Sequence, residues 1–255
     1  MAGALQVIPL PGIAEVLPGA DLAGLLVSAL SAAAVSARPD DVLVVAQKVV
    51  SKAEGRYVDL AGVTPGARAL ELATITGKDA RLIELVLAES VKVLRARRDV
   101  LIVRHRLGFV MANAGIDRSN LGAAAAQTQV LLLPLDPDHS AATLRASLAA
   151  RLGPAPGVII SDSFGRAWRR GVVNVALGAA GVPSLWNRRG ENDRAGRRLE
   201  VTEVGLADAL AAAAGLVMGE AAEGLPAALI RGAVLSAPHN SASTLLRPLE
   251  EDLFQ

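Results

Sequence analysis

The chain has 255 residues and no cysteine. Without cysteine, disulfides, thiolate metal sites, iron–sulfur clusters and cysteine nucleophiles are excluded. Aromatic residues make up only 2% of the sequence, which argues against the stacking surfaces that bind single-stranded nucleic acid. The charges nearly cancel, with 26 basic and 25 acidic residues, and neither a polybasic run nor an acidic tail is present. We therefore expect no nucleic-acid partner and no membrane partner.

Signals for export or membrane insertion are also missing from the sequence. The first residues lack the basic segment of a secretory signal. The longest apolar stretch, 205–219, contains Asp208 and is shorter than the roughly 20 apolar residues that span a bilayer. The absence of cysteine is compatible with a reducing compartment, so we expect a soluble cytoplasmic protein.

Several common site motifs are absent. The sequence has no G-x-x-x-x-G-K-[ST] P-loop, no G-x-G-x-x-G after a strand and no H-E-x-x-H. The three histidines, His105, His139 and His239, lie far apart and do not have the spacing of metal ligands. These absences argue against a P-loop nucleotide site and a histidine-based metal site.

Apolar runs of strand length alternate with longer helical patterns, which predicts a mixed α/β fold whose strand order cannot be read from the pattern. We expect one domain over residues 1–255, because no repeat or low-complexity linker divides the chain. The predicted strands are 5–10, 42–46, 57–60, 100–103, 109–111, 130–133, 158–161 and 227–230. The predicted helices are 21–34, capped by Asp21, and 67–74, 80–97, 140–152 and 206–218. The charged segment 187–198 is predicted to be a loop.

Polar residues follow two predicted strands and one predicted helix. They are Asn113, Asp117, Ser119 and Asn120 in "MANAGIDRSNLG", Asp162 and Ser163 in "ISDSFGR", and Glu220 and Glu223 after a helix stop at Gly219 in "VMGEAAEG". Each segment alone is typical of an ordinary turn. Together they form a set of oxygen ligands without histidine or cysteine, which suits Mg²⁺ or Mn²⁺.

Basic residues near these segments leave two interpretations open. The side chains of Arg118, Arg166, Arg169 and Arg170 could bind phosphate or carboxylate oxygens, or they could be solvated surface charges. In "VVAQKVVSKAEGR", the two lysines could hold phosphate or lie exposed on an edge strand. The residues alone do not decide between these interpretations.

Six segments, in this order, resemble the coenzyme F420-0:gamma-glutamyl ligase family. They are "PLPGIAEVLPGADL", "DVLVVAQKVVSKAEGR", "RLGFVMANAGIDRSN", "LPLDPDHSAATLR", "VIISDSFGRAWRRG" and "LEVTEVGLADALAAAAGLVMGEAAEGLPAALIRG", and they extend from about Val7 to Gly232. The resemblance implies a family-specific mixed α/β fold, neither P-loop nor ATP-grasp, and a homodimer. Some relatives carry a reductase-like domain after the ligase domain; we expect none in this chain.

The resemblance also implies an activity. Such enzymes use GTP to add L-glutamate to the deazaflavin precursor F420-0, and then a second, gamma-linked glutamate to the monoglutamyl form. An acyl-phosphate intermediate would activate the substrate carboxylate. Two divalent ions per site, Mg²⁺ or Mn²⁺, are implied, with K⁺ as an optional further ion.

Residue roles follow from the same resemblance. Asp117 and Asp162 would hold one metal ion, and Ser163 and Glu220 the other. The predicted GTP contacts are Ile13, Ala14, Glu15, Val16, Gln47, Lys52, Asn120, Met218, Gly219, Glu220, Ala221, Ala222, Glu223, Gly224 and Leu225. Catalytic roles fall on Asp162, Arg166 and Arg169, with Trp168 as a packing or stacking wall.

This chain departs from the family at two places. It has Val173-Asn174 where the family commonly has Thr-Asp, and Asp208-Ala209 where the family often has Asp-Glu. We expect neither departure to touch the proposed metal ligands. A metal-dependent phosphohydrolase or phosphotransferase, or a non-catalytic nucleotide-binding module, would be alternative functions for the same residues.

Overall fold

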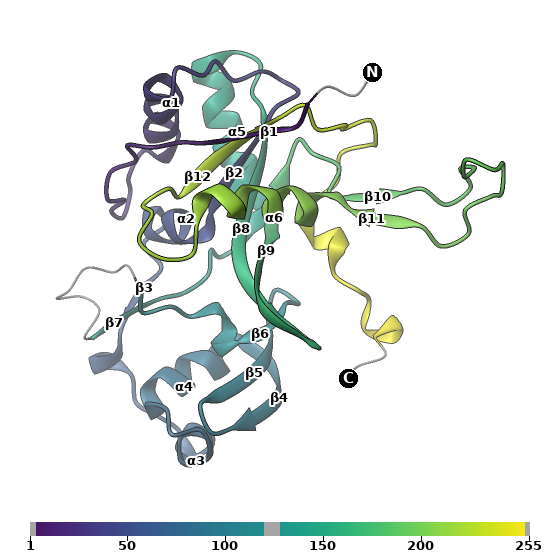
Figure 1. Ribbon diagram of the computed structural model, residues 1–255. Helices are drawn as coiled ribbons and strands as arrows, with labels where there is room; N and C mark the ends of the chain where they lie inside the picture. The colour runs from purple at the N-terminus through teal and green to yellow at the C-terminus, as the bar shows by residue number, and fades with distance from the viewer. Residues whose placement is uncertain (1–3, 120–127, 253–255) are drawn as a thin grey trace.

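The computed structural model describes residues 4–119 and 128–252 and confirms the mixed α/β class. A five-stranded sheet in the order β1-β12-β2-β8-β9 forms its centre (Figure 1). The strands are β1 (Gln6–Pro9), β2 (Val42–Ala46), β8 (Gly157–Arg166), β9 (Arg169–Ala180) and β12 (Ala227–Arg231). Strands β2 and β8 run parallel, and the other neighbouring pairs are antiparallel.

Helices cover both faces of this sheet, because its central strands are apolar on both sides. In β2, Leu43 and Val45 pack with α1 (Leu22–Ala32), α2 (Gln47–Ala53) and α5 (Pro137–Leu152). Val42 and Val44 point to the opposite face and pack with α6 (Leu206–Met218). Consecutive residues of one strand therefore belong to two separate cores.

A smaller unit with its own core lies below the main sheet in Figure 1. It contains α3 (Ala67–Thr76), α4 (Ala80–Ala88) and an antiparallel sheet of β4 (Ser90–Arg97), β5 (Val100–His105) and β6 (Val110–Ala112). A separate pair, β3 (Tyr57–Asp59) with β7 (Gln129–Leu131), leads into and out of this unit. Leu72, Ile83 and Val103 are among its fully or almost fully buried side chains.

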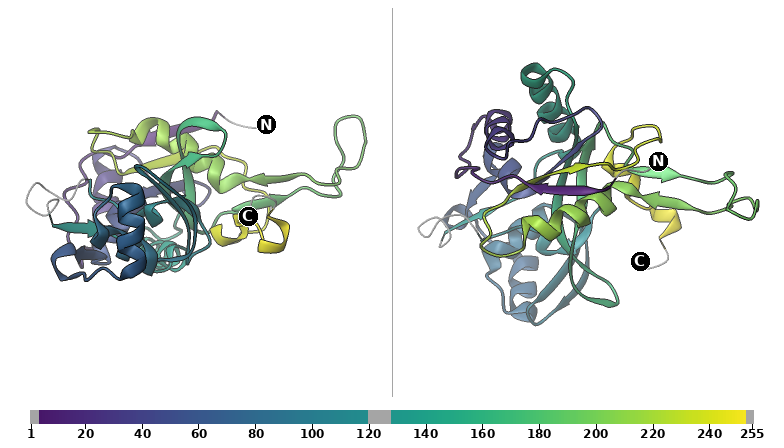
Figure 2. Two further views of the ribbon diagram at one scale, coloured as in Figure 1. Left: turned by 90° about the horizontal axis from the view of Figure 1, so that it is seen from below. Right: turned by 45° about the horizontal axis from the view of Figure 1, so that its top comes forward.

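The β8–β9 hairpin joins the two parts. Its strands leave the main sheet and extend down beside the smaller unit (Figure 1). Phe164 of β8 packs edge-to-face against Phe109, with ring centroids 6.1 Å apart. A second hairpin, β10 (Leu185–Asn187) with β11 (Glu203–Gly205), projects away from the rest of the chain (Figures 1 and 2). The predicted charged loop 187–198 lies largely at its outer end.

Several predicted elements agree with the structure. Strand β2 and helix α6 have the predicted bounds, 42–46 and 206–218. The carboxylate of Asp21 caps α1 as expected, accepting a hydrogen bond of 3.1 Å from the Gly24 N–H. Among the described residues, no helix combines the length and apolar character needed to cross a bilayer.

The predicted helix 80–97 is wrong in its second half. The helix ends at Ala88, and residues 90–97 form β4. Pairing with β5 supplies the backbone hydrogen bonds of this segment, and Asp99 adopts φ +62° in the turn between the strands. Val93 and Ala96 still pack on the smaller core, so their apolar spacing is satisfied by a strand as well as by a helix.

Candidate functional site

A cleft of about 460 Å³ lies at the edge of the main sheet where β2 ends. Strand β2 runs parallel to β8, and Ala46 of β2 lies opposite Ser161 of β8. The first residues of α2 therefore lie beside the continuation of β8. The cleft is closed on its other sides by segment 13–16 and by the loop that follows α6.

Almost all predicted nucleotide contacts line this cleft. They are Ile13, Ala14, Glu15, Val16, Gln47, Lys52, Met218, Gly219, Glu220, Ala221, Ala222, Glu223, Gly224 and Leu225. Asp162 and Ser163, two predicted metal ligands, line it as well. The remaining predicted contact, Asn120, lies outside the described residues. The structure thus brings four distant segments of the sequence to one site.

Asp162 and Ser163 lie within a strand. We expected both in a turn after a strand ending near Ser161, but β8 continues to Arg166 because β9 pairs with it along its length. Asp162 lies opposite Val175, and Ser163 opposite Asn174. The two side chains are consequently held by a paired backbone.

The loop after α6 begins as predicted. Helix α6 ends at Met218, and Gly219 adopts φ +75°. This backbone conformation is one that residues with a side chain rarely adopt, so it favours glycine at the turn. The loop is anchored at its other end by a hydrogen bond of 2.8 Å from the Ala46 N–H to the carbonyl of Pro226. Glu220 and Glu223 follow this turn at the rim of the cleft.

The two lysines lie on a helix, so the edge-strand interpretation of this segment is wrong. Lys48 Nζ is 2.5 Å from Asp117 Oδ2 and donates a hydrogen bond of 2.9 Å to Ser119 Oγ. The Lys52 ammonium forms an ion pair with the carboxylate of Glu15. Each lysine thus meets an acidic residue from a distant segment.

The charges of the cleft shift the pKa of both aspartates. Burial, with further repulsion from Asp117 and Glu220, raises the pKa of Asp162 to about 7 against the opposing effect of the Ser163 N–H and Lys48. Burial also acts to raise the pKa of Asp117. Hydrogen bonds from Lys48 and Ser119 outweigh that effect, and the pKa of Asp117 is lowered. Lys48 therefore favours the ionised form of both aspartates, and burial opposes it at both.

The donor set fits a divalent ion that also binds substrate oxygens. Within the described ranges, no three histidine, aspartate or glutamate side chains are gathered closely enough to form a preformed metal cage. Magnesium usually needs only one or two protein carboxylates and takes its other ligands from water and phosphate. Asp117 and Asp162 meet this requirement, and the Lys48 ammonium already holds a positive charge against Asp117.

Asn174 is a cleft residue that sequence reasoning missed. It lines the cleft, and its Nδ2 donates a hydrogen bond of 2.8 Å to Glu220 Oε1. Our expectation that the Val173-Asn174 departure leaves the metal ligands untouched is therefore wrong. The second departure is the pair Asp208-Ala209. The Asp208 carboxylate accepts a hydrogen bond of 2.9 Å from the Ala176 N–H, which connects α6 to β9.

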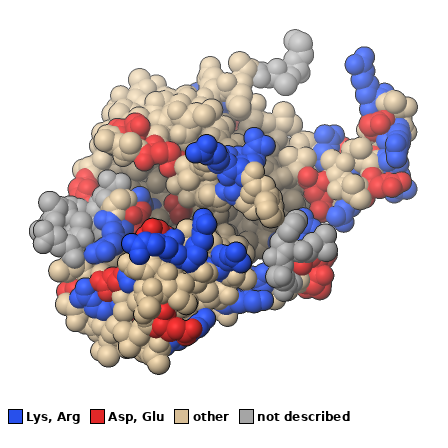
Figure 3. Space-filling view, turned by 60° about the horizontal axis from the view of Figure 1, so that its bottom comes forward, with Lys and Arg blue, Asp and Glu red and all other residues tan. Residues whose placement is uncertain are grey.

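Arg166, Arg169 and Trp168 lie at the far end of the β8–β9 hairpin, outside the residues that line the cleft. The guanidinium of Arg166 donates to the Arg170 carbonyl at 3.1 Å, and Trp168 is 90% exposed. Four residues of extended chain, about 13 Å, separate Asp162 from Arg166. Figure 3 shows Lys and Arg side chains gathered around a hollow in this face of the molecule. Catalytic roles for the two arginines remain a prediction.

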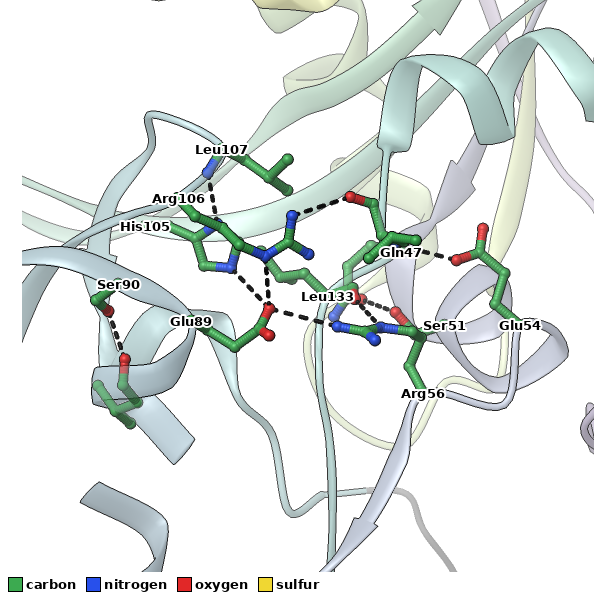
Figure 4. A network of polar contacts seen from close by, with 12 residues as sticks. Gln47, Ser51, Glu54, Arg56, Glu89, Ser90, His105, Arg106, Leu107 and Leu133 are labelled. Atoms are coloured by element: carbon green, nitrogen blue, oxygen red, sulfur yellow. Dashed lines mark hydrogen bonds and ion pairs between the residues drawn. The ribbon is translucent and has the colours of Figure 1, made fainter. Parts of the chain in front are cut away.

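Outside the cleft, a polar network around Glu89 connects the smaller unit to the segment after α2 (Figure 4). Glu89 Oε2 is 3.3 Å from Arg56 Nη2, 3.2 Å from Arg106 Nε and 3.4 Å from His105 Nε2. Burial is the main reason that the pKa of His105 falls to about 4. Its Nδ1 accepts a hydrogen bond of 3.0 Å from the Leu107 N–H, so the neutral ring carries its proton on Nε2, facing Glu89.

The fold and the cleft define a mixed α/β protein whose cleft brings lysine side chains and carboxylates together. Residues 12–232 match the family model described as F420-0:Gamma-glutamyl ligase. The chain is 43% identical over 253 residues to a coenzyme F420:L-glutamate ligase of Methanothermobacter thermautotrophicus, covering 98% of this chain and 99% of the relative. It is 46% identical over 228 residues to one of Methanopyrus kandleri, covering 89% of this chain and 87% of the relative. The chain therefore belongs to the F420-0:gamma-glutamyl ligase family, which confirms the resemblance drawn from its motifs.

Proposed function

We propose that this chain uses GTP to join L-glutamate to the deazaflavin precursor F420-0, and then in gamma linkage to the monoglutamyl product. Family membership and the names of the relatives support a ligase that acts on a coenzyme F420 precursor and L-glutamate, and the use of GTP is part of the proposal. The observation that carries the proposal for this chain is the shared cleft. Segment 13–16, the start of α2, the acidic part of β8 and the loop after α6 all line it.

In this proposal the cleft binds the triphosphate through separate segments. The loop Met218–Leu225 and segment Ile13–Val16 surround the nucleotide, and Lys52 meets its phosphates. The donor set would hold one Mg²⁺ or Mn²⁺ between Asp117 and Asp162, and a second between Ser163 and Glu220. Such ions neutralise charge on the phosphate oxygens during transfer. A serine hydroxyl is a weak ligand, so the second site is the looser one.

The chemical steps need positioning more than covalent participation by the protein. The terminal carboxylate of the substrate attacks the γ-phosphorus of GTP, and GDP leaves. The α-amine of glutamate then attacks the acyl carbon, inorganic phosphate leaves, and an amide forms with loss of the amine proton. The acidic cleft of this chain holds the donor and acceptor in one partly enclosed space, where water is less able to intercept the acyl phosphate.

Mass spectrometry of the deazaflavin product tests the proposal. Incubation with GTP, Mn²⁺ and L-glutamate should give a product heavier by one or more glutamyl units. Asp162→Asn should abolish this product, whereas Asp99→Asn, a matched change in an exposed turn, should leave it unchanged. Full turnover by the Asp162 variant would refute the metal role.

Two further outcomes distinguish the alternative functions. GTP hydrolysis at the same rate with and without glutamate would favour a phosphohydrolase. GTP binding with no turnover in the complete mixture would favour a nucleotide-binding module. Homodimer formation, implied by the family resemblance, is part of the proposal and is tested separately by light scattering in solution.

A further inference from the structure

The ammonium of Lys48 lies against Asp117, one of the proposed metal ligands. Lys48 Nζ lies 2.5 Å from Asp117 Oδ2 and 2.9 Å from Ser119 Oγ. The two charged side chains are only 29% and 27% exposed, so both are partly sheltered from water. Lys48 projects from the first turn of α2, whose preceding residue Ala46 is fixed by β2 pairing with β8.

We infer that Lys48 is an internal counter-cation, which a divalent ion must displace from Asp117 in order to bind there. The inference rests on the proposed function, because that function places a metal ion at Asp117. Lys48 occupies Asp117 Oδ2, and the other carboxylate oxygen, Oδ1, already accepts a hydrogen bond of 2.7 Å from the Ser119 N–H. A divalent ion at Oδ2 and the ammonium would repel each other strongly in this sheltered site, so binding of the ion there displaces Lys48.

The surrounding charges explain why a lysine is tolerated here without substrate. Asp117 and Glu220 lie close enough to Asp162 to repel its ionised form, and Lys48 acts on Asp162 as well as on Asp117. Without a cation, the three carboxylates would repel one another. Lys48 reduces this repulsion in the metal-free protein, which keeps the acidic segments together before any ligand arrives.

Displacement of Lys48 would couple the metal to an anion. The released ammonium remains tethered at the cleft, where an anionic phosphate or carboxylate of the substrate is the group that can neutralise it. Lys52 pairs with Glu15, which lies in segment 13–16 and is not a proposed metal ligand. Metal and anionic substrate should consequently bind with positive cooperativity that depends on Lys48.

Mn²⁺ binding to the full chain, measured by electron paramagnetic resonance of the free ion, tests this inference without deazaflavin or glutamate. Lys48→Met should bind Mn²⁺ about tenfold more tightly than the wild type when nucleotide is absent, within the usual range of coupling between sites. A non-hydrolysable GTP analogue should tighten Mn²⁺ binding to the wild type and change it much less in Lys48→Met. Lys92→Met, which removes an exposed lysine from β4, should behave as the wild type.

The Mn²⁺ affinities of the Lys48 variants can support or overturn the exchange. Equal or weaker Mn²⁺ binding by a folded Lys48→Met chain, or no binding by either protein, would overturn the exchange. Lys48→Arg, which restores the charge, should return the affinity toward the wild-type value. Tighter Mn²⁺ binding by Lys48→Met together with no glutamylated product from the wild type would retain the exchange and reject the proposed ligase function.

Discussion

Asn174 Nδ2 donates a hydrogen bond of 2.8 Å to Glu220 Oε1, which ties strand β9 to the loop after α6. Glutamate can only accept, so the amide orientation follows from the partner. The bond places an uncharged donor beside a proposed metal ligand. An aspartate at position 174 would add one negative charge around the second proposed metal site.

Asn174→Asp should change metal binding and stability in opposite directions. In the metal-free protein, the new carboxylate repels Glu220 and removes its donor. The free energy of unfolding should fall by about 1 kcal/mol, the value of an ordinary hydrogen bond, because this bond is exposed. With Mn²⁺ present, the added ligand should strengthen the weaker site. Urea unfolding and Mn²⁺ titration measure the two effects.

Asn187→Asp is the matched control, because its side chain already accepts a hydrogen bond of 2.9 Å from the Arg189 N–H and an aspartate can do the same. An Asn174→Asp chain with wild-type stability and wild-type Mn²⁺ stoichiometry would contradict the role of this amide.

Asp162→Asn should stabilise the metal-free protein at high pH. The pKa of Asp162 in the folded protein, about 7, lies above the usual value of 3.8. Its contribution to the free energy of unfolding is therefore most favourable below pH 4 and is lost as the pH rises to 7. The neutral amide avoids this loss. Between pH 5 and pH 8, the free energy of unfolding of the variant should rise relative to that of the wild type by up to about 3 kcal/mol, at about 1.4 kcal/mol per pKa unit.

Urea unfolding at both pH values, with chelator present, measures this gain. Adding Mn²⁺ at pH 8 should stabilise the wild type and leave the variant nearly unchanged. A stability difference that is the same at pH 5 and pH 8 would mean that Asp162 does not titrate in this range.

Glu89→Gln should loosen the junction between the smaller unit and the rest of the chain. The change leaves the guanidinium groups of Arg56 and Arg106 without their shared carboxylate, and Glu89 is only 16% exposed. We expect a loss of about 1–3 kcal/mol in the free energy of unfolding. Glu71→Gln, which affects an exposed ion pair with Arg68, should cost less than about 1 kcal/mol. Similar losses in the two variants would show that the network of Figure 4 contributes no more to stability than an exposed ion pair.

Lys52→Met should weaken GTP binding more than Arg166→Ala or Arg169→Ala. Lys52 lines the cleft, whereas both arginines lie at the exposed end of the β8–β9 hairpin. We expect about a tenfold loss of affinity for Lys52→Met, equivalent to about 1.4 kcal/mol, and less than a twofold change for each arginine variant. Isothermal titration with a non-hydrolysable GTP analogue measures the affinities. A tenfold loss in Arg166→Ala would show that the hairpin end reaches the nucleotide.

The local sequence determined much of this protein. The apolar run 42–46 was recognisable as a buried strand, Asp21 as a cap, and Gly219 as the end of α6. These features depend on side chains a few residues apart, whose periodicity and hydrogen bonds act within one element. The motifs that resemble the ligase family also identified most of the residues that line the cleft.

The tertiary structure determined which residues from distant parts of the chain lie opposite one another. Strand β9 pairs with β8 and makes Asp162 part of a strand, the segment after Ala88 becomes β4 instead of helix, and Lys48 meets Asp117 across two separate elements. The contact between Asn174 and Glu220 depends on the same long-range packing. Strand pairing and cross-element contacts are set by partners distant in the chain, and local periodicity carries no information about which partner will be chosen.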